Sequence, residues 1–389
     1  MEKKGKTGSA RNIAVITSVP SIRNYGSYFQ AYATQRLLEK RGYKVELISY
    51  SRPCKSSANE AWTVREIAAS IKGKKIFQSL PGMFRYIAAP MLYPSVSRQM
   101  KSFSAFAERY LHVTSAAYLD ENSLKANPPQ ADIYCTGGDQ MWNEHYNGHK
   151  TMREYYLSWA PEGKPRISLC TSIGKDRFDE WEKEEVRELL SKYSLISVRE
   201  DSGKKAIEEL GIENVYHLQD PVILLAVEEW EALAAPRVIK EKYILLYELS
   251  REAPLADYAR ELARRTGLKV VRINFYSFQT LRYGKSIMAP ALEQFLSLFR
   301  YAEYVITNSF HGTAFSIAFG RKFASVAGDH PGRLQSVLGY YGLTDRICGA
   351  PAEIYDVINQ PIDHADVEKK LSDARKDFDE YMNKVSDLL

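Results

Sequence analysis

A single histidine in a polar turn is the strongest candidate for chemistry in this chain. Residues 304–316 read Tyr-Val-Ile-Thr-Asn-Ser-Phe-His-Gly-Thr-Ala-Phe-Ser, which predicts a buried strand over 304–307, a tight turn and a helix over 313–319. His311 would then lie at the carboxyl end of a parallel strand beside a helix start, where open α/β sheets bind ligands and anions. There it could donate a proton to a bound phosphate or carboxylate compound. It could equally cap the helix or satisfy a core carbonyl, and the local pattern leaves both interpretations open.

Other polar residues follow predicted strands and would reach the same edge. Arg199 follows an apolar strand at 195–198, and its forked guanidinium suits a carboxylate or a phosphate. An ion pair with Glu200 or Asp220 is an equally good interpretation of Arg199. Asp139 follows a Gly-Gly turn and could bind a sugar hydroxyl or act as a base, although aspartate is also a common turn residue. The remaining candidates for substrate binding are Asn24, Tyr25, Gln140, Asn308, Ser309, Gly312, Thr313 and Arg333.

Alternating strands and helices are expected to position these side chains. A strand at 13–18, a helix at 27–41 and a strand at 45–50 form a βαβ unit, which requires a parallel sheet. The alternation continues to about residue 218 and meets a turn or helix boundary at Asp220-Pro221. It restarts at a strand over 243–248 and ends in a long charged helix from about 363 to 389. The pattern therefore predicts two Rossmann-type domains with parallel sheets facing a central cleft, and a C-terminal helix that crosses back to the first domain.

The bulk properties limit the domain count and the function classes. A chain of 389 residues is too long for one ordinary core, so we expect an N-terminal domain over 1–225 and a C-terminal domain over 237–389. The net charge of +5, from 53 basic and 48 acidic residues, does not indicate nucleic acid. Four widely spaced cysteines predict free thiols in the cytoplasm. Metal-ligand spacing, phosphate loops and dinucleotide fingerprints are absent from the sequence, so neither a metal nor a bound cofactor is expected.

A basic, helical insertion is expected over about 55–125. Within it, residues 67–107 lack acidic side chains and combine lysine and arginine with aromatic and aliphatic residues. This composition is typical of a segment that binds a membrane surface. A helical segment that packs on the first domain with a solvated basic face is the alternative.

Five sequence motifs occur in the order seen in a known family. They are residues 24–33 (Asn-Tyr-Gly-Ser-Tyr-Phe-Gln-Ala-Tyr-Ala), 136–143 (Thr-Gly-Gly-Asp-Gln-Met-Trp-Asn), 197–202 (Ser-Val-Arg-Glu-Asp-Ser), Asp220-Pro221, and 308–316, followed by Arg333. On these motifs the chain resembles the polysaccharide pyruvyl transferases from about residue 12 to 346. The resemblance implies a GT-B-like fold and a reaction that moves the enolpyruvyl carbons of phosphoenolpyruvate onto two hydroxyls of a sugar.

The resemblance also implies roles for particular residues. His311 would be the general acid that protonates the enol ether, and Asp139 the base. Arg199 and the helix start at 309–313 would bind the donor's carboxylate and phosphate. One departure is Phe310, because some members of the family carry arginine before the His-Gly pair and phenylalanine removes that cation.

The sequence thus favours a phosphoenolpyruvate-dependent transferase that acts on a surface-polysaccharide precursor of a capsule or exopolysaccharide. If the acceptor is a lipid-linked oligosaccharide, residues 67–107 would bring the enzyme to the inner face of the membrane. A GT-B glycosyltransferase that uses a nucleotide sugar is the first alternative. A non-catalytic protein that binds sugar or phosphate is the second, and the titratable residues at the strand ends of both halves speak against it.

Overall fold

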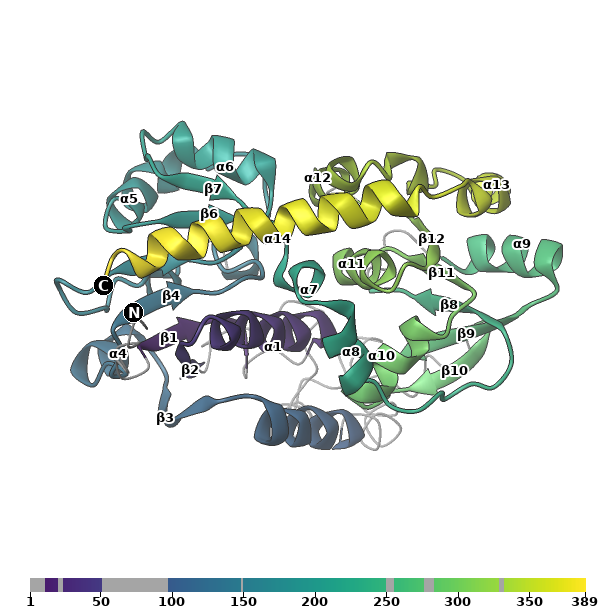
Figure 1. The fold of residues 1–389 in the computed structure, drawn as a ribbon, viewed down its shortest axis with the longest axis horizontal. Coiled ribbons are helices and arrows are strands. Elements are labelled where there is room, and N and C mark those ends of the chain that lie inside the picture. Colours follow the sequence, from purple (N-terminus) through teal and green to yellow (C-terminus); the bar gives the residue numbers. More distant parts are fainter. Residues whose placement is uncertain are drawn as a thin grey trace, which may run out of the picture.

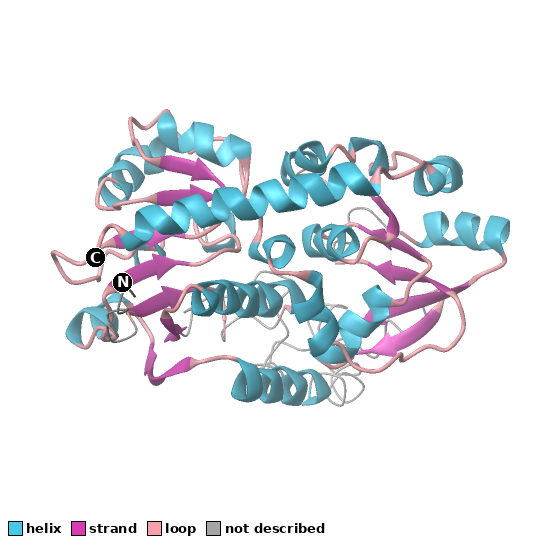
Figure 2. Ribbon diagram, viewed as in Figure 1, coloured by secondary structure: helices cyan, strands magenta, loops and turns pink. Residues whose placement is uncertain are grey.

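Short runs of buried aliphatic residues build two parallel sheets in this computed structural model, which describes residues 11–19, 24–50, 97–147, 150–249, 255–275, 283–328 and 332–389. The first sheet has the order β3-β2-β1-β4-β5, and the second has the order β10-β9-β8-β11-β12. Because each sheet is parallel and covered by helices, its central strands, such as β4 and β8, are buried on both faces and read as continuous apolar runs. Figure 2 shows both sheets between helical layers.

The strands of the first half are β1 (Asn12–Ile16), β2 (Lys44–Tyr50), β3 (Val113–Tyr118), β4 (Ile133–Thr136), β5 (Arg166–Ser168), β6 (Ile196–Val198) and β7 (Val215–His217). The pair β6-β7 continues the first sheet through isolated bridges from Ile167 to Leu195 and from Thr171 to Val198. The strands of the second half are β8 (Tyr243–Tyr247), β9 (Lys269–Asn274), β10 (Lys285–Met288), β11 (Tyr304–Thr307) and β12 (Lys322–Ser325). Counted within each half, both sheets have the strand order 3-2-1-4-5 of a Rossmann fold.

Helices connect these strands and form the outer layers. They are α1 (Tyr25–Lys40), α4 (Glu121–Ala126), α5 (Glu180–Leu190), α6 (Asp201–Glu208), α7 (Pro221–Leu224), α8 (Val227–Leu233), α9 (Ala256–Thr266), α10 (Leu292–Arg300), α11 (Phe310–Ala318), α12 (Gly332–Tyr341), α13 (Ile354–Asn359) and α14 (His364–Ser386). A further helix covers residues 97–110. Single 3-10 turns occur at Glu144–Asn147, Arg153–Tyr156, Thr344–Arg346 and Pro351–Glu353.

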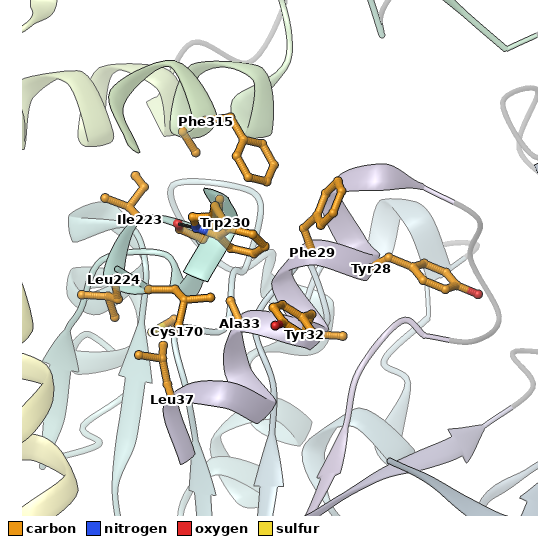
Figure 3. Packing of buried hydrophobic residues seen from close by; sticks show 14 of the residues in the cluster. Tyr28, Phe29, Tyr32, Ala33, Leu37, Cys170, Ile223, Leu224, Trp230 and Phe315 are labelled. Atoms are coloured by element: carbon orange, nitrogen blue, oxygen red, sulfur yellow. Dashed lines mark hydrogen bonds between the residues drawn. The ribbon is translucent and has the colours of Figure 1, made fainter. Parts of the chain in front are cut away.

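An aromatic cluster joins the two halves. Phe29 of α1 lies 5.1 Å from Phe315 of α11, and both rings contact Trp230 of α8 at 5.7 and 5.3 Å between centroids. Figure 3 shows these rings converging from three elements. Tyr25 of α1 adds a parallel stack on Phe295 of α10 at 4.5 Å. Burial of large aromatic side chains contributes roughly 2–3 kcal/mol each, so the two halves share one core.

Helix α14 crosses from the second half to the first, as the sequence predicts. In Figure 1 it runs from beside α12 and α13 to the edge where β1 begins. The hydroxyl of Tyr381 donates to the carbonyl of Ser168 in β5 at 2.7 Å, and Arg41 donates to the carbonyl of Asp379 at 2.6 Å. The prediction of two Rossmann-type units with a returning helix is therefore confirmed.

The insertion predicted over 55–125 needs one correction. It is not helical throughout, because residues 113–118 form β3 and pair with β2 at the sheet edge. The rings of Phe103 and Phe106 pack against Tyr28 at 4.7 and 6.3 Å, so this part of the segment 67–107 covers α1. Residues 51–96 lie outside the described part, and membrane contact through them stays a prediction.

Two further observations concern the chain as a whole. Among the helices within the described ranges, none is both long and apolar enough to cross a bilayer. Cys135, Cys170 and Cys348 are buried free thiols, while Cys54 lies outside the described residues. The exact domain limits predicted above stay predictions.

Candidate functional site

In both sheets the order in which the chain adds strands reverses at the central pair, and the candidate residues lie at the ends of those two strands. In the order 3-2-1-4-5 the chain reverses between the first and fourth strands, and ligands of open α/β sheets bind outside the carboxyl ends of these two strands. In the first half these ends are Thr17 after β1 and Gly137 after β4. In the second half they are Glu248 after β8 and Asn308 after β11. The first turns of α1 and α11 start beside these ends and face each other.

Helix α11 begins one turn earlier than the sequence predicts. Ser309 is extended and caps the helix, and its hydroxyl accepts from the backbone N–H of Gly312 at 3.4 Å. Serine is a better N-cap than Gly312, which would cap a helix that starts at Thr313. His311 therefore lies within the first helical turn, not in the preceding loop.

His311 is buried between charged groups of both signs. Its Nε2 has no hydrogen-bond partner among the described residues. Burial lowers the pKa of this imidazole; Asp220 and Asp139 raise it, Arg199 and Arg333 lower it, and the net direction is downward. The ring is therefore held in its neutral form when no anion is bound.

Arg199 lies in a buried ion-pair network. Its Nη1 donates to Asp220 at 2.8 Å and its Nε donates to Glu200 at 3.1 Å, with all three side chains at most 3% exposed. Both ion pairs considered in the sequence analysis are thus present, and neither is on the surface. The guanidinium also stacks over the Phe310 ring at 4.4 Å. Its Nη2 still has no partner in the described part of the chain.

Burial lowers the pKa of Arg199, but Glu200, Asp220 and Asp139 raise it more, so the guanidinium stays charged. Asp220 also accepts from the backbone N–H of Val222 at 2.9 Å and caps α7. The predicted helix boundary at Asp220-Pro221 is therefore correct. Helix α7 contacts α1, α11 and α14, so this cap lies where the two halves meet.

Asp139 is held by hydrogen bonds on both oxygens. Oδ2 accepts from Ser18 at 3.0 Å and from Ser27 at 2.5 Å, and Oδ1 accepts from its neighbour's backbone N–H at 2.9 Å. Its φ of 75° is in the left-handed region, which costs a non-glycine residue about 1 kcal/mol or more. Burial raises the pKa of Asp139, but Arg199, His311 and these hydrogen bonds lower it more. Its use as a base stays a prediction, and this environment makes it a weak one.

Several predicted substrate-binding residues hold the local structure. The Asn24 side chain caps α1 by accepting from Gly26 at 2.8 Å. The Tyr25 hydroxyl donates to the Pro290 carbonyl at 2.6 Å, and Thr313 is buried against Ser325 at 2.7 Å. These side chains position the site, and their contact with a substrate stays a prediction.

The remaining candidates surround the same region. Asn308 accepts from the backbone N–H of Leu249 at 2.8 Å and so joins the ends of β8 and β11. Gln140 accepts from Asn143 at 2.7 Å. Arg333, in the first turn of α12, is electrostatically coupled to His311. Gly312 fits tightly against Thr307, whose Oγ1 would lie 2.3 Å from an added Cβ atom.

The residues that sequence reasoning missed are Ser18, Ser27 and Gly26. The two serines bind Asp139, and Gly26 lies against the His311 ring. A single sequence carries no signal for such contacts, because they join residues more than 100 positions apart. Among the residues that the structure describes, no group of histidine, cysteine, aspartate and glutamate could hold a metal ion.

The architecture and site define a GT-B-like protein with its candidate site between two Rossmann-type domains. The sequence model described as polysaccharide pyruvyl transferase matches residues 24–330. The chain therefore belongs to the polysaccharide pyruvyl transferase family, which implies a transferase that acts on a polysaccharide. A search of curated protein sequences found no match.

Solved structures share the fold at low identity. The S. aureus MnaA structure with UDP is 11% identical, with a TM-score of 0.54 over 97% of this chain and 98% of that one. A UDP-N-acetylglucosamine 2-epimerase is also 11% identical, with a TM-score of 0.51 over 97% of this chain and 96% of that one. At this identity the likeness concerns the fold alone.

Proposed function

We propose that this protein transfers the enolpyruvyl carbons of phosphoenolpyruvate to two hydroxyls of a sugar in a surface-polysaccharide precursor. The products are a cyclic pyruvate ketal and phosphate. A lipid-linked oligosaccharide at the inner face of the membrane is the proposed acceptor. Family membership supports the reaction class, and the arrangement around Phe310 supports the donor.

The observation that supports this donor is a pair of buried polar atoms that have no partner within the described part of the chain. Among the residues that the structure describes, nothing bonds to Nη2 of Arg199 or to Nε2 of His311, and both side chains contact the Phe310 ring, at 4.4 Å and 5.3 Å. A buried donor without an acceptor costs about 1–3 kcal/mol. A small anion with several acceptor oxygens would satisfy both atoms, and phosphoenolpyruvate carries a carboxylate and a phosphate.

The chemistry assigns His311 the first proton transfer. A proton from its Nε2 goes to the terminal methylene carbon of the donor, which becomes a methyl group and leaves an electron-poor central carbon. One sugar hydroxyl bonds to that carbon, the bond to phosphate breaks, and the second hydroxyl forms the other ketal bond. Of the two hydroxyl protons, one restores His311 and one leaves with phosphate.

The site still contains a cation although position 310 is a phenylalanine. The sequence suggests that phenylalanine at this position weakens anion binding, but its ring stacks against the guanidinium of Arg199, whose central carbon lies 4.4 Å from the ring centroid. A cation–π contact at a desolvated site contributes about 2 kcal/mol. Arg199 is therefore proposed to supply the charge on the donor's carboxylate or phosphate.

A binding experiment separates this proposal from its main alternative. Phosphoenolpyruvate, a UDP-sugar, a GDP-sugar and inorganic phosphate are each added to the purified protein, and the melting temperature is measured. We expect phosphoenolpyruvate to raise the melting temperature by a few degrees, because a ligand at 100 times its Kd stabilises by about 2.7 kcal/mol. Stabilisation by a nucleotide sugar alone would instead support a glycosyltransferase and remove the proposal.

A turnover experiment tests the acid. We expect His311→Asn to reduce phosphate release from phosphoenolpyruvate by about 10²–10⁴-fold, the usual contribution of a general acid. A mixture of free sugars and lipid-linked oligosaccharides serves as the acceptor. His364→Asn, at an exposed position at the start of α14, is the matched control and should keep full activity. Normal turnover by His311→Asn would remove His311 from its proposed role.

A further inference from the structure

The first turn of α1 bears directly on the His311 imidazole. A Cβ atom added to Gly26 would lie 2.1 Å from Nδ1, 2.5 Å from Cγ and 2.7 Å from Cε1 of His311. Real Cβ atoms do not approach other atoms so closely. The φ angle of Gly26 is not positive. The lack of space, and not the backbone conformation, therefore requires glycine here.

Hydrogen bonds of the neighbouring residues hold the backbone around Gly26 in place. On one side Asn24 accepts from the Gly26 N–H at 2.8 Å, and the Tyr25 hydroxyl is bonded to Pro290 in the second half at 2.6 Å. On the other side Ser27 donates to Asp139 in the first half at 2.5 Å. The turn is therefore anchored to both halves, and a side chain at position 26 would displace the imidazole.

The start of α11 is held equally firmly. Gly312 lies against Thr307, and the Ser309 backbone N–H donates to the Thr307 hydroxyl at 3.0 Å. Because the backbone on both sides of the contact is fixed, the freedom that remains is rotation of the His311 ring. The Nδ1 edge faces Gly26, which directs Nε2 away from α1.

We propose that Gly26 is a positioning residue, whose missing side chain lets α1 fix the plane of the His311 ring and the direction of Nε2. This inference rests on the proposed role of His311 as the acid. Since Gly26 belongs to the first half and His311 to the second, the acid is oriented only when the two halves are packed together.

Kinetics of Gly26→Ala test the inference. We expect kcat for phosphate release to fall by about 100-fold, the effect of a displacement of about 1 Å. KM for phosphoenolpyruvate should change much less, because Arg199 is untouched. Gly203→Ala is the control, since Gly203 also lies in a buried first helical turn, that of α6, and an added Cβ meets its nearest atom at 3.6 Å. Equal kcat values in the two variants would overturn the inference.

A pH profile and a stability cycle distinguish this role from a purely structural one. A displaced ring should lose part of the desolvation that lowers the pKa of His311, so the alkaline limb of the kcat profile should move to higher pH in Gly26→Ala. The melting temperature should fall in Gly26→Ala, and much less so when His311→Ala is already present, because the imidazole is the obstacle. Independent effects of the two changes would contradict the contact.

The two proposals can fail separately. If the unaltered protein does not turn over phosphoenolpyruvate, the proposed function fails, and the stability cycle still tests the packing of Gly26 on His311. If the unaltered protein is active and Gly26→Ala matches Gly203→Ala, only the positioning role is lost.

Discussion

At the scale of single residues, the site combines a neutral histidine with a charged arginine. Burial and two guanidinium groups depress the pKa of His311, whereas three carboxylates keep Arg199 protonated. A general acid must carry a proton, so something has to raise the pKa of His311 before catalysis. An anionic donor beside Nε2 has that effect, because an opposite charge within about 4–6 Å favours the charged form.

Donor binding should therefore take up a proton. We expect phosphoenolpyruvate to be bound with uptake of up to one proton at pH 7, where the unliganded imidazole is neutral and the liganded one is charged. Isothermal titration calorimetry in two buffers with different ionisation enthalpies measures this number. His311→Asn should bind without uptake, and the same proton count in that variant would place the titrating group elsewhere.

The Arg199–Asp220 pair should contribute strongly to stability. Asp220→Asn keeps the cap on Val222 but leaves Arg199 with less compensation, and breaking a buried pair costs about 3–5 kcal/mol. Urea denaturation measures the free energy of unfolding. The control is Asp257→Asn, which breaks an exposed pair with Arg260 and should cost less than about 1 kcal/mol. Similar losses of unfolding free energy in both variants would contradict the expectation that the buried pair stabilises the fold more than an exposed pair does.

At the scale of elements, α1 is the part that connects both sheets to the site. It follows β1 and is capped by Asn24. It carries Ser27 to Asp139, Gly26 to His311 and Tyr25 to the second half. Helix α1 is buried on nearly all sides, because it packs against β2 and α7 and its Phe29 ring contacts Trp230 of α8.

Tyr25 offers a graded test of this connection. Tyr25→Phe removes one hydrogen bond to the Pro290 carbonyl but keeps the stack on Phe295, so we expect a loss of about 1 kcal/mol. Tyr25→Ala also removes the ring, and about 3–5 kcal/mol should be lost. Denaturation in urea compares the two variants. Equal losses would show that the stack contributes little to the contact between the halves.

At the scale of the whole molecule, the two halves should unfold together. One core cluster runs from β1 and α1 through Trp230 to α10, α11 and α14. Helix α14 is also hydrogen-bonded to the first half, through Tyr381 to Ser168 and through Asp379 to Arg41. Circular dichroism and tryptophan fluorescence should therefore give coincident urea transitions. Two separate transitions would mean that the shared core is not enough to couple the domains.

Most of the fold could be predicted from the pattern of the sequence. The βαβ alternation, the strands at 133–136 and 304–307 and the final helix were all recognisable, because hydrophobic periodicity reflects burial directly. Strand β3 was not recognised. It lies at a sheet edge where five of its six residues are not fully buried, so it carries no continuous apolar run.

The candidate site could be predicted only in part. The sequence alone pointed to His311, Arg199 and Asp139, since polar residues after buried strands collect at one edge of a parallel sheet. It determined which residue types were present and which edge they would reach. Tertiary structure decided their partners: Arg199 pairs with Asp220 and Glu200, Phe310 supports that arginine, and Gly26 meets His311. The contacts of Phe310 and Gly26 depend on how the two domains pack, and local periodicity does not encode the distance between residues of different domains.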